Sequence, residues 1–191
     1  MRHLAIALMS FAVAVAQADP AAPTLKAGVF DPPRAAPDFS LQGTNGRELR
    51  MSRHRGKIVL LAFGYSSCQA VCPTTLATFA EARRRLGGAA SQVQVIYVTV
   101  DPERDDVPHL KKYLENFDNT FVGGTGTPSQ LSLIRKDYGI SAERVATGDG
   151  YSYSHSSFTY LVDRAGKIRA LMPYGHSPQD YVHDLTILLA E

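Results

Sequence analysis

The feature that most constrains this chain is an unbroken apolar run over residues 58–65, Ile-Val-Leu-Leu-Ala-Phe-Gly-Tyr, followed by a helical pattern that reaches Arg85. An apolar run of this length is typical of a strand buried on both faces of a sheet. A second run of the same kind covers residues 93–100. Strand, helix and strand in this order predict a β-α-β unit with a right-handed crossover at the centre of an α/β fold.

Cys68 and Cys72 are the only two cysteines, and they lie between the first strand and its helix. We predict that both occupy the first helical turn, where side chains at i and i+4 project to the same side. Two such thiols are close enough to share a metal ion or to form a disulfide. The positive end of the helix favours the thiolate that both chemistries need. A disulfide closing so short a loop would stabilise the fold little, so the spacing favours chemistry.

The remaining elements arrange themselves around this unit. The sequence predicts hairpins over residues 39–50 and 158–171, an extended piece at 121–123, and helices over 105–117, 127–138 and 177–189. Residues 143–157 are polar and rich in Gly, Ser and Tyr, and we predict a loop there. The order predicts an α/β fold with a thioredoxin-like central sheet flanked by helices. It adds an amino-terminal β-hairpin and an insertion after the second central strand.

The amino terminus has the pattern of a secretory signal peptide over residues 1–18. Arg2 supplies the positive charge, residues 4–15 are apolar, and Ala16-Gln17-Ala18 fits the cleavage site. An uncleaved membrane anchor is the alternative, although about a dozen apolar residues is short against the roughly 20 that span a bilayer. We therefore expect a periplasmic protein, with a membrane-anchored form as the other outcome.

The mature chain is then divided in two. Residues 19–37 are rich in proline and predict an extended linker, which leaves residues 38–191 as one domain. The formal net charge is +2 and no dense run of Lys and Arg is present, so nothing indicates a nucleic-acid partner.

A metal held by two thiolates needs a further donor from elsewhere in the chain. Thiolates favour Cu(I) and Zn, and two thiolates with one imidazole suit a three-coordinate cuprous ion. His155 precedes the predicted strand 158–162, and the loop before that strand packs against the dithiol in a thioredoxin-like topology. A histidine bonded within its own polar loop explains His155 equally well. The other histidines are His3 in the predicted signal and four that we predict to be at the surface, His54, His109, His176 and His183.

Three blocks of sequence resemble the Sco/SenC copper chaperones of cytochrome c oxidase assembly, over roughly residues 36–190. They are the segment from Gly56-Lys57 to Cys68-x-x-x-Cys72-Pro73, residues 100–105 (Val-Asp-Pro-Glu-Arg-Asp), and His155 with residues 158–163 (Phe-Thr-Tyr-Leu-Val-Asp). The resemblance implies one copper ion, as Cu(I) or Cu(II), bound by these two cysteines and His155. It also implies that the protein delivers copper to, or reduces, the binuclear copper site of oxidase subunit II. We expect a monomer with a protein partner and no small-molecule substrate.

The chain departs from the family pattern at two places. Gln69-Ala70 stands where family members often have Pro-Asp, and Ser154 stands where they often have Asp. Neither change removes a ligand, but both lose charge or rigidity near the site. They bear on copper affinity and on which oxidase is served.

Two other groups of residues have more than one interpretation. The acids Asp101, Glu103 and Asp105 could form a metal cluster, but an Asp-Pro turn leading into a helix amino terminus explains them more simply. Tyr151 and Tyr153 either screen the metal or contact a partner, or they simply pack.

Two rival functions use the same cysteines. A metal-free thiol–disulfide oxidoreductase needs the same reactive dithiol, but thioredoxins use C-x-x-C and a proline facing it, and residues 143–160 contain no proline. A peroxiredoxin-like peroxidase fits Ser66-Ser67-Cys68 poorly. The chaperone and oxidoreductase roles are compatible, because loss of copper leaves a dithiol that can exchange.

Overall fold

The structure is a computed structural model that describes residues 24–148 and 150–191. Its strands are β1 (Gly28–Ala35), β2 (Leu41–Gly43), β3 (Glu48–Leu49), β4 (Ile58–Gly64), β5 (Val93–Thr99), β6 (Val122–Thr125), β7 (Ala142–Thr147), β8 (Gly150–His155), β9 (Phe158–Val162) and β10 (Lys167–Pro173). Its helices are α1 (Val71–Leu86), α2 (Val107–Glu115), α3 (Pro128–Tyr138) and α4 (Pro178–Ala190), with short 3-10 helices η1 (Met51–His54) and η2 (Gly87–Gln92). The predicted signal peptide lies outside the described residues.

The main sheet has the strand order β1-β10-β9-β4-β5-β6-β2-β3. Strand β4 pairs in parallel with β5, with Gly64 opposite Thr99, and pairs antiparallel with β9, with Ala62 opposite Thr159. Every residue of β4 is buried, as its apolar sequence requires. The predicted β-α-β unit and thioredoxin-like arrangement are therefore confirmed.

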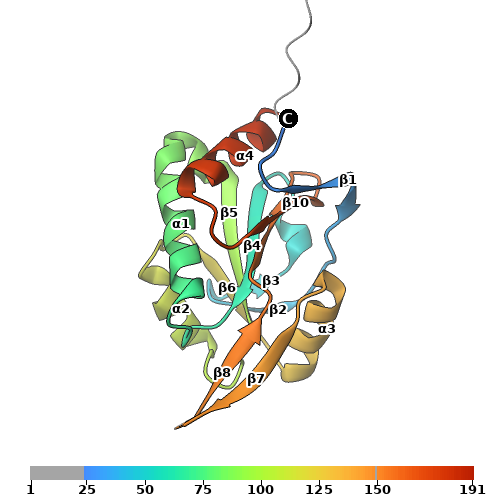
Figure 1. Cartoon of the computed structure of the whole chain (residues 1–191). Helices are drawn as coiled ribbons and strands as arrows, with labels where there is room; N and C mark the ends of the chain where they lie inside the picture. The colour runs from blue at the N-terminus through green and yellow to red at the C-terminus, as the bar shows by residue number, and fades with distance from the viewer. Residues whose placement is uncertain (1–23, 149) are drawn as a thin grey trace, which may run out of the picture.

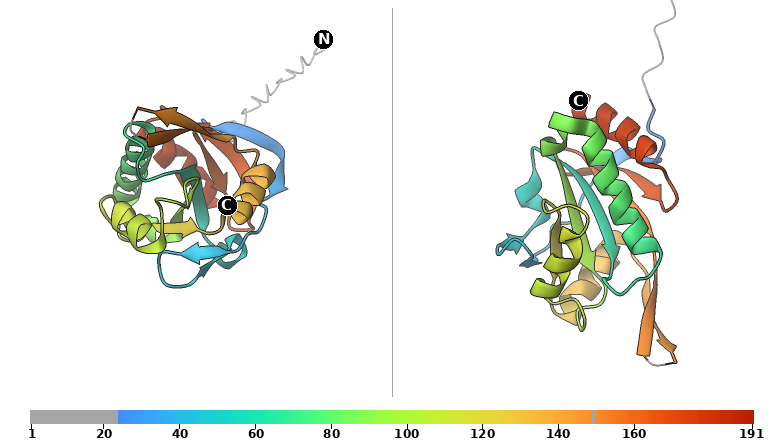
Figure 2. Two further views of the ribbon diagram at one scale, coloured as in Figure 1. Left: turned by 90° about the horizontal axis from the view of Figure 1, so that it is seen from below. Right: turned by 90° about the vertical axis from the view of Figure 1, so that its left-hand side faces the viewer.

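Helices cover both faces of this sheet (Figures 1 and 2). Helices α1, α2 and α4 lie on one face and α3 lies on the other. On the first face, the rings of Phe79 in α1 and Tyr181 in α4 meet edge to face with centroids 5.2 Å apart. On the second face, Tyr138 of α3 packs against Phe63 of β4 at 5.5 Å. The large side chains of β4 and the helices thus form one core on the two faces of the sheet.

Two helices begin with a capping box, in agreement with their sequence. Ser177 caps α4, its hydroxyl accepting the Asp180 amide, and Pro178 occupies the first helical position. Thr127 caps α3 in the same way with Gln130. The predicted start of the last helix is confirmed.

The predicted extended linker over residues 19–37 includes residues 28–35, which pair with the main sheet. These residues form β1, an edge strand that pairs antiparallel with β10. The ladder is interrupted between Val29 and Arg34, where Pro32 and Pro33 lie. Proline lacks an N–H to donate, and an edge strand with an irregularity tolerates it. The extended conformation was predicted from proline content, but the pairing was not. The boundary of the domain stays a prediction.

The prediction of a loop over residues 143–157 is wrong. Residues 142–147 and 150–155 form the antiparallel strands β7 and β8 of a hairpin, a two-stranded sheet separate from the main one. Figure 1 shows this hairpin projecting from the body of the protein. Its residues are exposed or half-buried, so neither strand has the row of buried apolar side chains that marks a core-facing strand.

Among the described residues, no helix is both long enough and apolar enough to cross a membrane.

Candidate metal and dithiol site

Cys68 and Cys72 lie beyond the carboxyl end of β4, but they do not share a helical turn as predicted. Helix α1 begins at Val71, so Cys72 lies in its first turn and Cys68 lies in the turn that precedes it. The backbone N–H of Cys72 donates to the Cys68 sulfur over 3.4 Å. The sulfur of Cys68 thus occupies the place of a capping acceptor, because the first amides of a helix have no partner inside the helix.

The pKa values of the two thiols are shifted in opposite directions. A hydrogen bond from the Cys72 thiol, with the amides of residues 70–72, lowers the pKa of Cys68 to about 5, although partial burial opposes this change. The same hydrogen bond and burial raise the pKa of Cys72 above its ordinary value. Cys68 is half-buried and Cys72 is only 3% exposed. The pair therefore consists of an accessible thiolate and a shielded thiol.

Gly64 makes room for the second sulfur. A Cβ atom at this position would lie 2.8 Å from Cys72 Sγ and closer still to the Tyr97 hydroxyl, so only glycine fits. Tyr97 is fully buried, and its hydroxyl finds no well-formed hydrogen bond among the described residues. Burial, and next the charge of Cys72, raise the pKa of Tyr97 well above its ordinary value. The floor of the site is therefore a phenol beside the buried sulfur, a feature that the sequence did not predict.

His155 ends β8 and comes within 3.6 Å of Cys72, measured from imidazole Nε2 to Sγ. Its other ring nitrogen, Nδ1, lies 2.9 Å from the carbonyl oxygen of Ser156. A carbonyl oxygen only accepts, so Nδ1 carries a proton and donates it, and Nε2 is the ring nitrogen that faces the sulfur. A hydrogen bond at one ring nitrogen that fixes the other for a metal is the usual arrangement of a histidine ligand.

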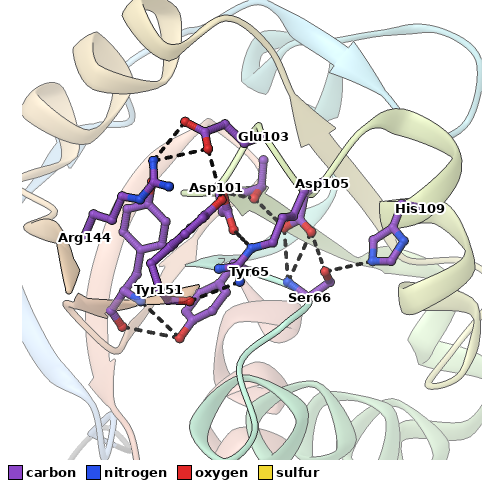
Figure 3. Close-up of polar contacts among 11 residues, drawn as sticks. Tyr65, Ser66, Asp101, Glu103, Asp105, His109, Arg144 and Tyr151 are labelled. Atoms are coloured by element: carbon purple, nitrogen blue, oxygen red, sulfur yellow. Dashed lines mark hydrogen bonds and ion pairs between the residues drawn. The ribbon is translucent and has the colours of Figure 1, made fainter. Parts of the chain in front are cut away.

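Tyr65 and Asp105 hold the turn that carries Cys68 (Figure 3). The hydroxyl of Tyr65 accepts the Tyr153 amide at 3.3 Å, and the Tyr65 ring packs edge to face on His155 with centroids 5.9 Å apart. The fully buried Asp105 accepts the amide of Ser66 at 3.1 Å, and the Ser66 hydroxyl also donates to it. One side of the turn is thus tied to the hairpin and the other to the segment before α2.

The three acids after β5 are not a metal cluster, because protein donors occupy their oxygens. Asp101 accepts from Tyr151 at 3.0 Å, and Glu103 accepts from Arg144 at 3.1 Å. The expected helix cap is instead Asp106, which accepts the His109 amide at 2.8 Å. Asp101 and Asp105 are both fully buried, so they bind neighbouring segments together and do not merely begin a helix.

Among the described residues, no hydrogen bond joins the sulfur of either cysteine to any other histidine. His54 is half-buried, His183 pairs with Asp184 at 2.8 Å, and His109 contacts the Ser66 hydroxyl at 3.0 Å. His176 was predicted to be an ordinary surface residue. Its side chain is 31% exposed, and it lines, together with Cys72 and His155, a cavity of about 230 Å³ between α1, β9 and the start of α4.

The donors are near one another but not closed into a cage. Within residues 24–148 and 150–191, no three or more His, Cys, Asp or Glu side chains are arranged tightly enough to hold a metal ion as they stand. The two cysteines are unbridged. The structure thus has the arrangement of a reduced dithiol with a histidine poised beside its buried sulfur.

Comparison with known proteins identifies the family. The sequence model of the SCO1/SenC family matches residues 30–190 of this chain. The chain belongs to the SCO1/SenC family. An SCO2-like protein of Rickettsia conorii is 32% identical over 151 residues, which are 78% of this chain and 74% of that protein. The mitochondrial SCO2 homologue of Bos taurus is 33% identical over 133 residues, 68% of this chain and 50% of that protein.

Solved structures of SCO1/SenC relatives share the fold. ScoI of Bradyrhizobium japonicum, solved with copper bound, is 34% identical and superposes with a TM-score of 0.75 over 81% of this chain and 99% of that chain. The apo Sco1 protein of Thermus thermophilus is 31% identical with a TM-score of 0.73, over 90% and 98% of the two chains. The resemblance to Sco/SenC proteins inferred from three sequence blocks is therefore confirmed.

Proposed function

We propose that this SCO1/SenC protein binds one copper ion through Cys68, Cys72 and His155. We propose further that it carries this copper to, or keeps reduced the thiols of, the binuclear copper site in subunit II of cytochrome c oxidase. The observation that carries the proposal is the position of His155, which is 83 residues from Cys72 in sequence yet places Nε2 within 3.6 Å of its sulfur.

The donor set fits copper. Two soft thiolates favour Cu(I), and an added imidazole supports Cu(II) as well. The Cys68 thiolate forms readily, and Nδ1 of His155 is held by Ser156, so Nε2 is the nitrogen that binds. Binding would draw the three side chains together and displace the proton of Cys72, so the affinity should fall as the pH falls. A relative at 34% identity was solved with copper bound, which supports copper as the metal.

Thiol–disulfide exchange is a second candidate, which the unequal thiols favour. The accessible Cys68 thiolate would attack a disulfide of the partner, forming a mixed disulfide and releasing one partner thiolate. Cys72 would then lose its proton and attack Cys68, which releases the second partner thiolate and leaves a Cys68–Cys72 disulfide. Copper binding and this disulfide exclude each other, because both use the same sulfur electrons.

Copper binding by single variants tests the site. The protein is purified and kept without oxygen, and copper content and free thiols are measured on the same sample. The parent should bind one copper ion. Cys68→Ser and Cys72→Ser should each abolish tight binding, and His155→Ala should weaken Cu(II) more than Cu(I). His183→Ala is the control and should bind like the parent.

A Cys72→Ser protein with full affinity would refute the two-thiolate site. Reduction of a subunit II disulfide by the copper-free parent would favour the second candidate.

The compartment is proposed from the amino-terminal sequence. We propose export to the periplasm with cleavage after Ala18, so that the mature chain begins at Asp19. Cell fractionation and intact-mass measurement test this. Met1 retained on a membrane-bound form would show an anchor instead.

A further inference from the structure

Tyr151 on β8 is held between two arginines from different segments (Figure 3). The guanidinium carbon of Arg144 lies 3.5 Å from the centroid of the Tyr151 ring, and that of Arg104 lies 3.9 Å from it. Two guanidinium groups this close to one centroid would overlap on a single face, so they occupy opposite faces. Cations over an aromatic face are attracted to it, most strongly where water is partly excluded.

Polar contacts join this stack to the body of the protein. The Tyr151 hydroxyl donates to the buried Asp101 at 3.0 Å, and its backbone carbonyl accepts from Arg104 at 3.1 Å. Arg104 also pairs with Asp101, and Arg144 pairs with Glu103 at 3.1 Å. We call these five residues the tyrosine clamp. Its anchor is Asp101, which is fully buried, so the clamp fixes β8 to the segment after β5.

The clamp and the metal donor lie on the same face of β8. Side chains alternate along a strand, so Tyr151, Tyr153 and His155 point to one side. Tyr151 contacts Asp101 within the clamp, Tyr153 contacts Tyr65, and His155 contacts Cys72. The hairpin has only two strands and is separate from the main sheet. Such a hairpin is marginally stable alone, so these contacts decide where it lies.

The strand acts as a lever between the clamp and His155. His155 lies four positions after Tyr151 on the strand, a distance of about 13 Å at roughly 3.3 Å per residue. A rotation of about 10° about Tyr151 would therefore move His155 by about 2 Å, which is as long as a typical metal–imidazole bond. Small changes in the clamp are enough to bring the imidazole to the sulfurs or to remove it.

We propose that the tyrosine clamp positions His155, and that it thereby sets the preference of the site for Cu(II) over Cu(I). This inference rests on the proposed copper site. With the clamp intact, the site offers two thiolates and an imidazole, which accommodate Cu(II). With the clamp broken, the hairpin moves and leaves the two thiolates, which still satisfy Cu(I). Tyr151, Arg104 and Arg144 are positioning residues, since none of them donates to the metal.

Affinities for both copper states test the proposal in the purified protein. Tyr151→Leu should lower Cu(II) affinity by about 10–100-fold, as changes behind a metal ligand usually do. Its Cu(I) affinity should stay within about threefold of the parent, because the two thiolates are unchanged. Tyr151→Phe keeps the ring between the guanidinium groups and should lose less. Glu143→Gln, an exposed charge change on β7, is the matched control and should bind like the parent.

A double variant shows whether the clamp acts through His155. Tyr151→Leu combined with His155→Ala should lose no more Cu(II) affinity than His155→Ala alone, because the clamp has nothing left to position. Additive losses would overturn the proposal. Arg144→Gln changes a half-exposed side chain and should show a smaller loss of the same kind, which keeps the test usable if Tyr151→Leu does not fold.

A measurement without metal separates this inference from the proposed function. In the copper-free protein, proton NMR should detect contact between the Tyr65 and His155 rings, and Tyr151→Leu should lose it. Hydrogen exchange of the Ser152 and Ser154 amides should also quicken. A parent that binds no copper refutes the proposed function. A Tyr151→Leu protein that keeps both the ring contact and the parental Cu(II) affinity refutes the clamp.

Discussion

The lowered pKa of Cys68 predicts that this cysteine reacts faster than an ordinary thiol at low pH and slower at high pH. Hydrogen bonding from Cys72 and the helix amides lowers the pKa of Cys68 from an ordinary value of 9.0 to about 5. A lowered pKa means that the thiolate persists to lower pH, while each thiolate becomes a weaker nucleophile. We therefore compare the alkylation rate of the reduced, metal-free protein with that of a free cysteine derivative from pH 8 to pH 4.

The magnitude follows from these two opposing effects. At pH 6 about 90% of Cys68 is thiolate against about 0.1% of an ordinary thiol, a ratio of about 900. A Brønsted slope of about 0.45 over four units of pKa lowers the intrinsic reactivity about 60-fold. Cys68 should therefore react about 15-fold faster than the reference at pH 6. At pH 8 the reference is about 10% thiolate, and Cys68 should be about sixfold slower. The two rates should cross near pH 7.

Peptide mapping after alkylation with iodoacetamide supplies the assay. Cys68 should be labelled first, because Cys72 is buried and its pKa is raised. The Cys68 rate should fall by half only near pH 5. Cys72→Ala is the matched control, since it removes the thiol donor, and its midpoint should move upward toward 9. A rate that falls tenfold per pH unit between pH 8 and pH 6, as for an ordinary thiol, would refute the reasoning.

Three further predictions concern stability. Gly64→Ala should lower the free energy of unfolding in urea by about 1–3 kcal/mol, because the new methyl group meets the Cys72 sulfur and a tyrosine hydroxyl; an unchanged midpoint would show that the core gives way freely. Asp105→Ala should cost about 1–3 kcal/mol and quicken hydrogen exchange at the Ser66 amide, which loses its acceptor; slow exchange in the variant would contradict this role. Ser177→Ala should cost about 1 kcal/mol in thermal denaturation, and no loss would mean that the cap of α4 contributes nothing.

The core of the fold could be predicted because its signals are local. The run over residues 58–65 is apolar at every position, and a strand with both faces buried needs that composition. Ser177-Pro178 predicted the start of α4 because both residues act on the first helical turn. Within the predicted hairpin over residues 39–50, Asn45-Gly46 is a typical turn pair, and Gly46 adopts a positive φ of 75° there. None of these features depends on distant residues.

The β7–β8 hairpin could not be predicted from hydrophobicity because it does not face the core. A signal was nevertheless present in Tyr151-Ser152-Tyr153-Ser154-His155, where large rings alternate with serines at the period of a strand. The prediction counted polar residues and missed this alternation. Gly148 follows the last residue of β7 and Gly150 is the first residue of β8, and glycines at such positions are typical of a hairpin turn.

The acids after β5 show a second limit of sequence reasoning. Proximity in sequence predicted a helix amino terminus, and Asp106 alone has that role. Asp101 and Asp105 are buried, and burial of a carboxylate requires donors. Some of those donors are local, Arg104 for Asp101 and Thr99 for Asp105, but Tyr151 and Ser66 lie 50 and 39 residues away. The pairing depends on the finished fold, so no local pattern could reveal it.

Different interactions hold the two halves of the site. The cysteine half is built on β4 and α1, where Gly64 admits a buried sulfur against the core, so hydrophobic patterning could predict it. The histidine half is carried by a hairpin outside the core and fixed by rings, guanidinium groups and carboxylates. Motif resemblance predicted a metal-binding role for His155, whereas reasoning from the residues alone left that role open. The departure at Ser154 fits this division. Ser154 is exposed and lies on the opposite side of β8 from His155. The loss of a charge at this position therefore leaves the contacts of Tyr65 and Ser156 with His155 unchanged.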